Sequence, residues 1–318
     1  MAINWRVVFL GTPDFAVASL NALLEKNITV VGVVTMPDKK SGRGRKLSAS
    51  PVKQYAEQHN IPVLQPTNLK APEFIEELKA LQPDIQVVVA FRMLPEAVWN
   101  LPPNGTINVH ASLLPNYRGA APINWAIING EEKSGVTTFQ LQHKIDTGNI
   151  LLQHEVDITP TDNAGDLHDK LMASGAELLV ETIEGLYNNT ITPSPQDHIA
   201  ENELKEAPKI FRETCYLNWS DTSENIINKV RGLSPYPGAV TQLTQDNNET
   251  VEVKVLEAIA TDLTIPEGKA KQTETQLYIG TADKALEITL LQYPNKKRMA
   301  TADFLRGFNH LFLNTSVE

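Results

Sequence analysis

Short apolar runs alternate with amphipathic segments through the first half of the chain. The runs predict buried β-strands because they are hydrophobic on both faces and are bounded by turn-forming residues. Between them, hydrophobic residues recur near helical spacing, as Phe15, Leu20 and Leu24 do after Pro13. The predicted strands are 5–11, 28–35, 61–66, 84–91, 105–110, 135–142 and 149–158, and the predicted helices are 13–26, 50–60, 71–81 and 163–187.

This alternation predicts a Rossmann-like α/β domain. Strands that are apolar on both faces and separated by helices are typical of a parallel sheet with helices covering both sides. The last two strands, 135–142 and 149–158, show alternating polarity and follow each other closely. We therefore expect a mostly parallel sheet that is mixed at one edge.

The pattern changes after this domain. Residues 189–208 are polar and rich in proline, with no apolar period, which predicts a linker. Beyond it, short alternating stretches broken by Asn, Gly and Pro predict a small, OB-like β-barrel. The predicted organisation is a catalytic domain at 1–188, a linker at 189–208 and a C-terminal domain at 209–318.

Composition agrees with a globular protein of about two domains, because 42% of the 318 residues are hydrophobic and 21% are charged. No run reaches the roughly 18 apolar residues of a membrane span, and the first residues lack a cleavage-site pattern. Cys215 is the one cysteine, so it cannot form an internal disulfide, and it suits a reducing compartment. We expect a cytoplasmic protein without a membrane segment, and no pattern demands a dimer, so we expect a monomer.

The charge distribution contains one local reversal. A formal net charge of −10 argues against a protein that binds nucleic acid over a broad surface, because phosphates require clustered Lys and Arg. Residues 39–46 nevertheless contain five basic side chains, two glycines and no acid. Such a run is often only a solvated loop, but it is also the composition of a phosphate-binding segment.

Cofactor signatures of nucleotide-binding folds are missing. The first strand ends at Gly11, but a dinucleotide fingerprint requires three glycines, and the stretch "SGRGRKLS" lacks the spacing of a phosphate loop. Gly11 therefore indicates a tight turn between strand and helix.

The stretch "INVHASLLPNYRGAAP" places two polar side chains inside an apolar strand. Asn108 and His110 are two residues apart and therefore share one face at the carboxyl end of the strand, where open parallel sheets bind ligands. An amide donor and a group that titrates near neutrality are suited to attack on a carbonyl. Asp146, in the turn "KIDTGNI", is a candidate partner that would orient the imidazole.

Other mechanisms lack their residues. There is no G-x-S-x-G elbow, and Cys215 is remote in sequence from these residues. The other histidines show no metal-ligand spacing, so we expect no metal. A direct transfer between two bound substrates fits better than a covalent intermediate.

Four motifs in this order, "GTPDFA", "SGRGRKL", "INVHASLLPNYRGAAPINWAI" and "IDTGNI", resemble those of the methionyl-tRNA formyltransferase family, within the folate-dependent formyltransferases. The resemblance spans most of residues 5–190, and the linker and small β domain extend it. It implies that Asn108, His110 and Asp146 are the catalytic residues. It also implies a folate site, formed by Ser112, Leu113, Leu114, Pro115 and Phe91.

For the basic segment the resemblance implies contact with the acceptor end of tRNA, with Arg43 as the leading residue. The set is Arg43, Arg45, Lys46, Lys39 and Lys40. The implied reaction moves the formyl group of 10-formyltetrahydrofolate to the amino group of methionyl-tRNA, which is used in translation initiation. The alternative is a related enzyme that formylates a small amine, such as an amino-sugar nucleotide or glycinamide ribonucleotide.

Two stretches depart from the family pattern. The segment "VVVAFRMLP" is one residue shorter than the usual A-Y-G-x-I-L-P form, which affects the expected pteridine pocket around Phe91. Near Asp146, residues Gln142, Lys144 and Asn149 replace the frequent Asp, Gly and Asp. We expect a stiffer and differently charged loop around an unchanged aspartate.

Overall fold

The computed structural model describes residues 3–41, 46–196, 204–308 and 310–315. Contacts divide the chain into two compact units. The first comprises Met1–Gly119, Ser134–Asp157 and His168–Glu206, and the second comprises Ala120–Lys133, Ile158–Leu167 and Ala207–Glu318. The second unit thus includes two short stretches that precede residue 189.

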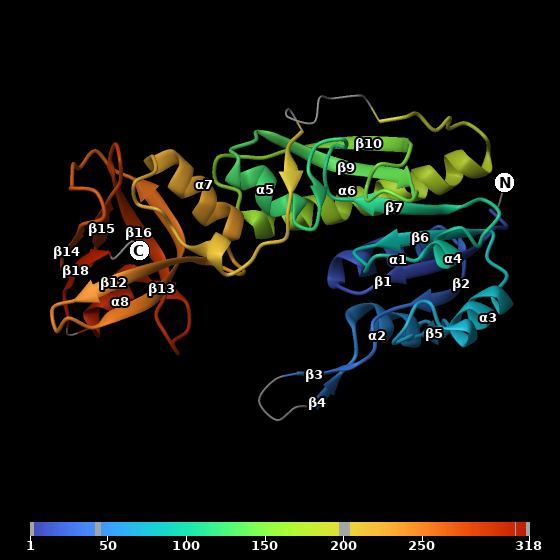
Figure 1. Ribbon diagram of the computed structural model, residues 1–318, viewed down its shortest axis with the longest axis horizontal. Helices are drawn as coiled ribbons and strands as arrows, with labels where there is room; N and C mark the ends of the chain where they lie inside the picture. Colours follow the sequence, from blue (N-terminus) through green and yellow to red (C-terminus); the bar gives the residue numbers. More distant parts are fainter. Residues whose placement is uncertain (1–2, 42–45, 197–203, 309, 316–318) are drawn as a thin grey trace. The chain divides into compact units, whose positions relative to one another are not determined.

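A seven-stranded sheet forms the first unit, with the order β10-β9-β7-β6-β1-β2-β5 (Figure 1). Its strands are β1 (Arg6–Gly11), β2 (Thr29–Val34), β5 (Val63–Leu64), β6 (Ile85–Val89), β7 (Thr106–His110), β9 (Lys133–Gln140) and β10 (Ile150–Asp157). The pairs β1–β2, β1–β6, β2–β5 and β6–β7 are parallel, whereas β7 and β9 are antiparallel. This confirms the predicted Rossmann-like sheet that is mixed at one edge.

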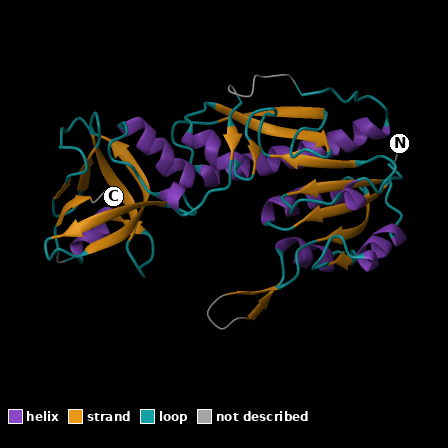
Figure 2. Cartoon of the chain, viewed as in Figure 1, coloured by secondary structure: helices purple, strands orange, loops and turns teal. Residues whose placement is uncertain are grey.

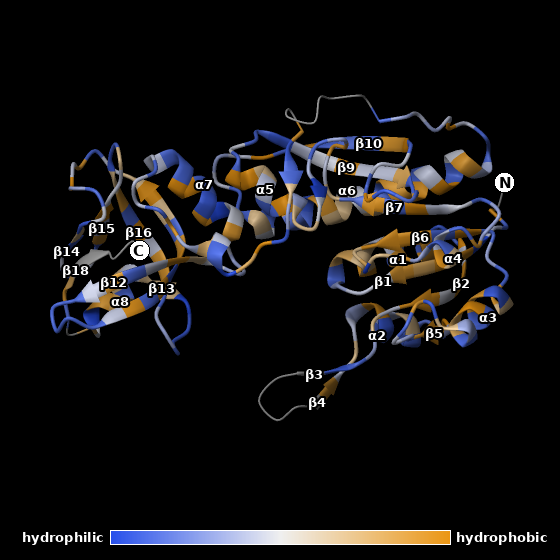
Figure 3. Ribbon diagram, in the orientation of Figure 1, coloured by the Kyte–Doolittle hydropathy of each residue, from blue (hydrophilic) through white to orange (hydrophobic). Residues whose placement is uncertain are grey.

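Helices surround the sheet: α1 (Asp14–Glu25), α2 (Pro51–Gln58), α3 (Pro72–Ala80), α4 (Glu96–Trp99) and the long α6 (Ala164–Tyr187). On one face, Val8 and Val88 pack in a buried cluster with Phe74 and Leu78 of α3. The opposite face meets α6, where Gly175 lies against Val109 of β7. The strongly hydrophobic colour of β1 and β6 in Figure 3 reflects burial on both faces.

The described ends of the basic segment belong to two paired strands. Strands β3 (Lys39–Ser41) and β4 (Lys46–Ser48) pair antiparallel, and the hairpin stands out from the rest of its unit in Figure 1. At its base, Lys53 of α2 forms a 2.8 Å ion pair with Asp38, and Gln65 donates to the other oxygen of Asp38 at 2.8 Å. The base is therefore anchored to the sheet domain.

The second unit is a curled antiparallel sheet with short helices (Figure 2). Its sheet has the order β14-β15-β16-β13-β12-β18, and β17 pairs with β16. The elements are α5 (Pro122–Ile128), the 3-10 helix η2 (Glu213–Cys215), α7 (Ser223–Leu233), β12 (Ala239–Gln245), β13 (Thr250–Ala260), β14 (Ala270–Gln272), β15 (Leu277–Gly280), β16 (Ala285–Gln292), β17 (Met299–Ala300), α8 (Thr301–Arg306) and β18 (Phe312–Thr315).

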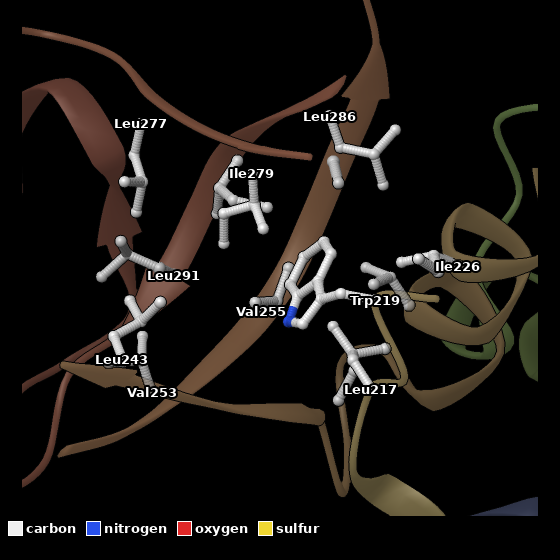
Figure 4. Close-up of a cluster of buried hydrophobic side chains, with 14 of the residues drawn as sticks. Leu217, Trp219, Ile226, Leu243, Val253, Val255, Leu277, Ile279, Leu286 and Leu291 are labelled. Atoms are coloured by element: carbon white, nitrogen blue, oxygen red, sulfur yellow. The ribbon is translucent and has the colours of Figure 1, made fainter. Parts of the chain in front are cut away.

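Trp219 lies at the centre of this curled sheet. Figure 4 shows its indole among Leu217, Val255 and Ile226, and its ring nitrogen donates to Thr241 Oγ1 at 2.9 Å. The two edge strands also meet, because the Gln272 side chain of β14 accepts from the backbone N–H of Phe312 at 3.2 Å. The sheet therefore curls so that its two edges approach each other, in agreement with the predicted small β domain. Among the helices that the structure describes, none has the length and apolarity needed to cross a membrane.

Candidate functional site

Asn108 and His110 lie on the same face of β7, at its carboxyl end. Asn108 is in register with Val88 of β6 and with Phe139 of β9, and His110 is in register with Thr137. The intervening Val109 points the other way, toward Gly175 of α6. The two polar side chains therefore face the side of the sheet that carries Val88, away from α6.

The imidazole of His110 is fixed by a backbone carbonyl. His110 is 7% exposed, and its Nε2 donates to the carbonyl oxygen of Tyr117 at 2.9 Å. Its ring also meets Phe139 edge-on, with 6.4 Å between the centroids. Because a carbonyl only accepts hydrogen bonds, Nε2 carries a proton in this arrangement, which leaves Nδ1 as the acceptor of the neutral ring.

Asn108 presents a different environment. Its side chain is partly exposed and forms no hydrogen bond with any residue that the structure describes. An asparagine amide offers two N–H donors, so this side chain can donate to an incoming ligand without first breaking a protein contact. A free amide donor and a restrained imidazole on one face of a strand are groups suited to attack on a carbonyl.

Asp146 lies in a tight turn between β9 and β10. Its backbone φ is 52°, a left-handed conformation that Asp tolerates better than most residues. Its Oδ2 accepts from the N–H of Gly119 at 3.0 Å. A Cβ at Gly148 would lie 1.6 Å from the carbonyl oxygen of Gln140, so only glycine permits the close return of this turn to β9.

Both ionisable side chains converge on one short segment, 117–119. His110 binds its first residue and Asp146 binds its last. Within the described residues the two side chains are linked through this segment and not by a direct hydrogen bond. His110 and Asp146 are 36 residues apart in sequence, yet both side chains bind this one segment of three residues.

The loop after β7 is held by two residues that the sequence did not single out. Thr137 Oγ1 donates to Ser112 O at 2.7 Å and accepts from Leu114 N at 3.1 Å. Gln153 of β10 donates to Leu114 O at 3.0 Å. The Leu114–Pro115 peptide bond within this loop is cis. No sequence motif marks either anchor, because each acts on main-chain atoms of a distant segment.

Phe91 lies just beyond β6, on the same side of the sheet as Val88. It is partly buried against the cluster that contains Val88, and it follows Ala90, whose φ is 48°. Next to it, Arg92 donates to the carbonyl oxygen of Thr67 at 3.2 Å, and its guanidinium lies 5.8 Å from the Phe91 ring centroid. The shortened segment is therefore tied to the loop after β5.

Of the basic residues predicted to contact tRNA, Lys39 is described and exposed. Arg43 and Arg45 lie outside the described residues, as do the side chains of Lys40 and Lys46. The backbone of Lys39, Lys40 and Lys46 belongs to the two strands of the hairpin.

The polar segment 189–208 is attached to the site in several places. Ser194 pairs with Ile150 of β10. Further along, the short strand β11 (Glu206–Ala207) pairs with β8 (Arg118–Gly119). Tyr117, whose carbonyl binds His110, donates its N–H to Lys205 O at 2.5 Å. The described parts of this segment are thus bound to the chain around the site.

No group of three or more His, Cys, Asp or Glu side chains within the described ranges is arranged to hold a metal ion. The chemistry that the site offers is an amide donor, an imidazole and a carboxylate.

Solved structures with the same fold include two that were crystallised with a folate present. HypX from Aquifex aeolicus in complex with tetrahydrofolic acid aligns with a TM-score of 0.65 at 20% identity, over 99% of this chain and 51% of that chain. This chain therefore spans about half of the HypX chain. WlaRD, a sugar 3N-formyl transferase solved in the presence of dTDP and 5-N-formyl-THF, aligns with a TM-score of 0.64 at 22% identity, over 92% and 99% of the two chains.

Comparison of the amino-acid sequence identifies the family more specifically than comparison of the fold. The model of the formyl transferase family matches residues 5–183, and that of the formyl transferase C-terminal domain matches residues 209–309. The methionyl-tRNA formyltransferase of Bacteroides thetaiotaomicron is 49% identical over 95% of both chains. That of Azobacteroides pseudotrichonymphae is 50% identical over 96% of this chain and 97% of its own. With both domains matched and such relatives along nearly its whole length, this chain belongs to the methionyl-tRNA formyltransferase family.

Proposed function

We propose that this enzyme transfers the formyl group of 10-formyltetrahydrofolate to the amino group of methionyl-tRNA, with Asn108, His110 and Asp146 as catalytic residues. The relatives named for this activity cover nearly the whole chain, including the C-terminal domain. The single observation that carries the assignment of residues is the free Asn108 amide beside the restrained His110 at the carboxyl edge of the sheet.

The reaction requires stabilisation of one oxyanion and movement of one proton. The amine nitrogen attacks the formyl carbon, a new C–N bond forms, and the bond from that carbon to N10 of the folate breaks. The amine loses a proton and N10 gains one. In this proposal Asn108 donates to the oxyanion, and His110 accepts the amine proton, since its Nδ1 is the ring acceptor. Asp146 orients His110 through segment 117–119 and relays the proton through water.

Folate is proposed to bind along Ser112, Leu113, Leu114 and Pro115, with Phe91 beside the pteridine ring. Two features support this site. The loop is rigidly anchored by Thr137 and Gln153, and Phe91 lies on the same side of the sheet as Asn108. Pre-ordered loops suit ligand binding because little conformational entropy is lost when the ligand arrives.

The β3–β4 hairpin is proposed to bind the acceptor end of tRNA through Arg43, Arg45, Lys46, Lys39 and Lys40. Its local positive charge contrasts with a formal net charge of −10 for the chain. The proposed domains are 1–188 for catalysis, 189–208 as the connecting segment and 209–318 as a further tRNA-contacting domain. The proposed state is a cytoplasmic monomer, in the compartment where aminoacylated tRNA is used.

Asn108→Ala tests the assignment. Loss of one oxyanion donor typically lowers turnover by about 10²–10³. We expect that loss in kcat, measured as formylation of methionyl-tRNA, with folate affinity and thermal stability retained. Asn188→Ala, at an exposed asparagine just after α6, is the matched control and should leave kcat unchanged. Unchanged turnover of Asn108→Ala would refute the assignment, and faster formylation of an amino-sugar nucleotide or glycinamide ribonucleotide than of methionyl-tRNA would refute the substrate.

A further inference from the structure

Gln196 is a buried polar residue in the segment that the sequence predicts to be a linker. It is 8% exposed, and its amide uses both its donors and its acceptor within the protein. Such an amide holds its partners firmly in place, because each buried hydrogen bond left unmade costs about 1–3 kcal/mol.

The donors of Gln196 hold the turn that carries Asp146. Its Nε2 donates to Asp146 O at 2.8 Å and to Gly148 O at 2.9 Å. These two carbonyls flank Thr147, so a single amide group fixes both sides of the turn. The left-handed backbone of Asp146 is sparsely populated in an unrestrained chain, which makes an external restraint on it consequential.

The acceptor of Gln196 holds the other side of the site. Its Oε1 accepts from Arg118, with 3.1 Å to Nε and a second bond to the same guanidinium. Arg118 lies between Tyr117, which binds His110, and Gly119, which binds the Asp146 carboxylate. Gln196 therefore connects the Asp146 turn to the segment on which both ionisable side chains converge.

We propose that Gln196 is a positioning residue for Asp146 in formyl transfer. This inference rests on the catalytic role proposed for Asp146. With its main chain held on both sides, the carboxylate keeps one direction relative to segment 117–119, and thus relative to His110. Misplacement of a catalytic group by about 1 Å can cost about 10²-fold in rate.

The first test removes the N–H donors of the Gln196 side chain but keeps its size and its acceptor oxygen. Gln196→Glu presents a carboxylate to two carbonyl oxygens while retaining the contact with Arg118. We expect kcat to fall about 10- to 100-fold, while the KM values for both substrates stay within about threefold. Gln58→Glu, which adds the same charge at the exposed end of α2, should leave kcat unchanged. If Gln196→Glu fails to fold, Gln196→Met, which adds no charge, replaces it in the same assays.

The second test is a double-mutant cycle with Asp146→Asn, measured under single-turnover conditions with excess enzyme. If Gln196 acts through Asp146, its substitution should have little further effect once the carboxylate is gone. If the two substitutions instead lowered the rate independently, so that their fold-losses multiplied in the double variant, the inference would be overturned. A wild-type kcat in the Gln196 variants would overturn it as well. Wild-type turnover of Asp146→Asn alone would instead refute the proposed catalytic role of Asp146, so the two failures can be distinguished.

Discussion

Thr137 illustrates at the scale of one residue how a buried hydroxyl can shape a binding loop. Its Oγ1 donates to Ser112 O and accepts from both Leu114 N and Gln153 Nε2, at 2.7 to 3.1 Å. It is fully buried, so water cannot replace these bonds when the hydroxyl is lost. This one hydroxyl therefore binds the proposed folate loop at Ser112 and Leu114, and it also binds Gln153, which holds the same loop.

Thr137→Val should loosen this loop. Valine keeps the shape of threonine but removes the hydroxyl that the three partners bind, and a buried group left without its hydrogen bond costs about 1–3 kcal/mol. We expect a higher KM for 10-formyltetrahydrofolate and a lower melting temperature. Thr137→Ser, which retains the hydroxyl, should restore both values toward those of the wild type. If the KM for folate were unchanged while stability fell, the loop would have a structural role only.

The residues that could be read from the sequence are those that belong to a local pattern. Asn108 and His110 stand out because they interrupt an apolar strand, and Asp146 stands out in a turn. Thr137, Gln153 and Gln196 carry no such signal. Each binds main-chain atoms of a segment distant in sequence, so its partner is defined only by the tertiary fold.

Among the secondary-structure elements, the strands of the sheet domain were the most predictable. Burial on both faces produces continuous apolar runs, and β1, β2, β6 and β7 lie within the predicted ranges. Helices α5 and α7 were not predicted. Helix α5 directly follows the Pro/Gly-rich stretch after β7, and α7 begins inside a region whose polarity otherwise alternates as in strands. Within the second unit the two helices pack against each other, a contact between segments that are distant in sequence.

The N-terminus of α7 depends on Asp283, which precedes β16. Its carboxylate accepts from the N–H of Ser223 at 2.7 Å and from the Ser223 hydroxyl at 3.0 Å. The backbone bond from Ser223 is the main reason that the pKa of Asp283 is lowered from 3.8 to about 2. A carboxylate at a helix N-terminus also interacts favourably with the helix dipole.

This lowered pKa predicts a pH-dependent contribution to stability. Because the folded pKa lies below the unfolded one, Asp283 stabilises the fold fully above about pH 4, and the contribution is lost as the pH falls toward 2. Asp283→Asn should therefore melt at a lower temperature than the wild type at pH 7, and the difference should shrink between pH 4 and pH 2. Thermal denaturation by circular dichroism across this range checks the prediction. A difference that is independent of pH would contradict it.

For the whole molecule, charge is distributed unequally. A formal net charge of −10 opposes the approach of a polyanion, whereas the β3–β4 hairpin concentrates basic residues in one place. In the proposed binding mode, this local positive charge would orient an incoming tRNA as well as attract it.

Arg43→Ala tests this arrangement. We expect the KM for methionyl-tRNA to rise, with little change in the KM for folate, and the salt dependence of tRNA binding to weaken by about one unit of slope because one phosphate contact is lost. Lys79→Ala, at an exposed lysine of α3 paired with Glu76, is the control and should change neither KM. Equal effects of Arg43→Ala on both substrates would exclude a specific role in tRNA binding.

The location of Gln196, beyond residue 188, has a consequence for chimeric enzymes. An exchange of C-terminal domains at residue 188 would replace Gln196 together with the domain, and the imported segment would have to hold the recipient's Asp146 turn. A junction after residue 208 keeps the recipient's own segment 189–208, and so keeps the native contact with the Asp146 turn. Domain exchange between relatives is therefore expected to preserve turnover better at the later junction.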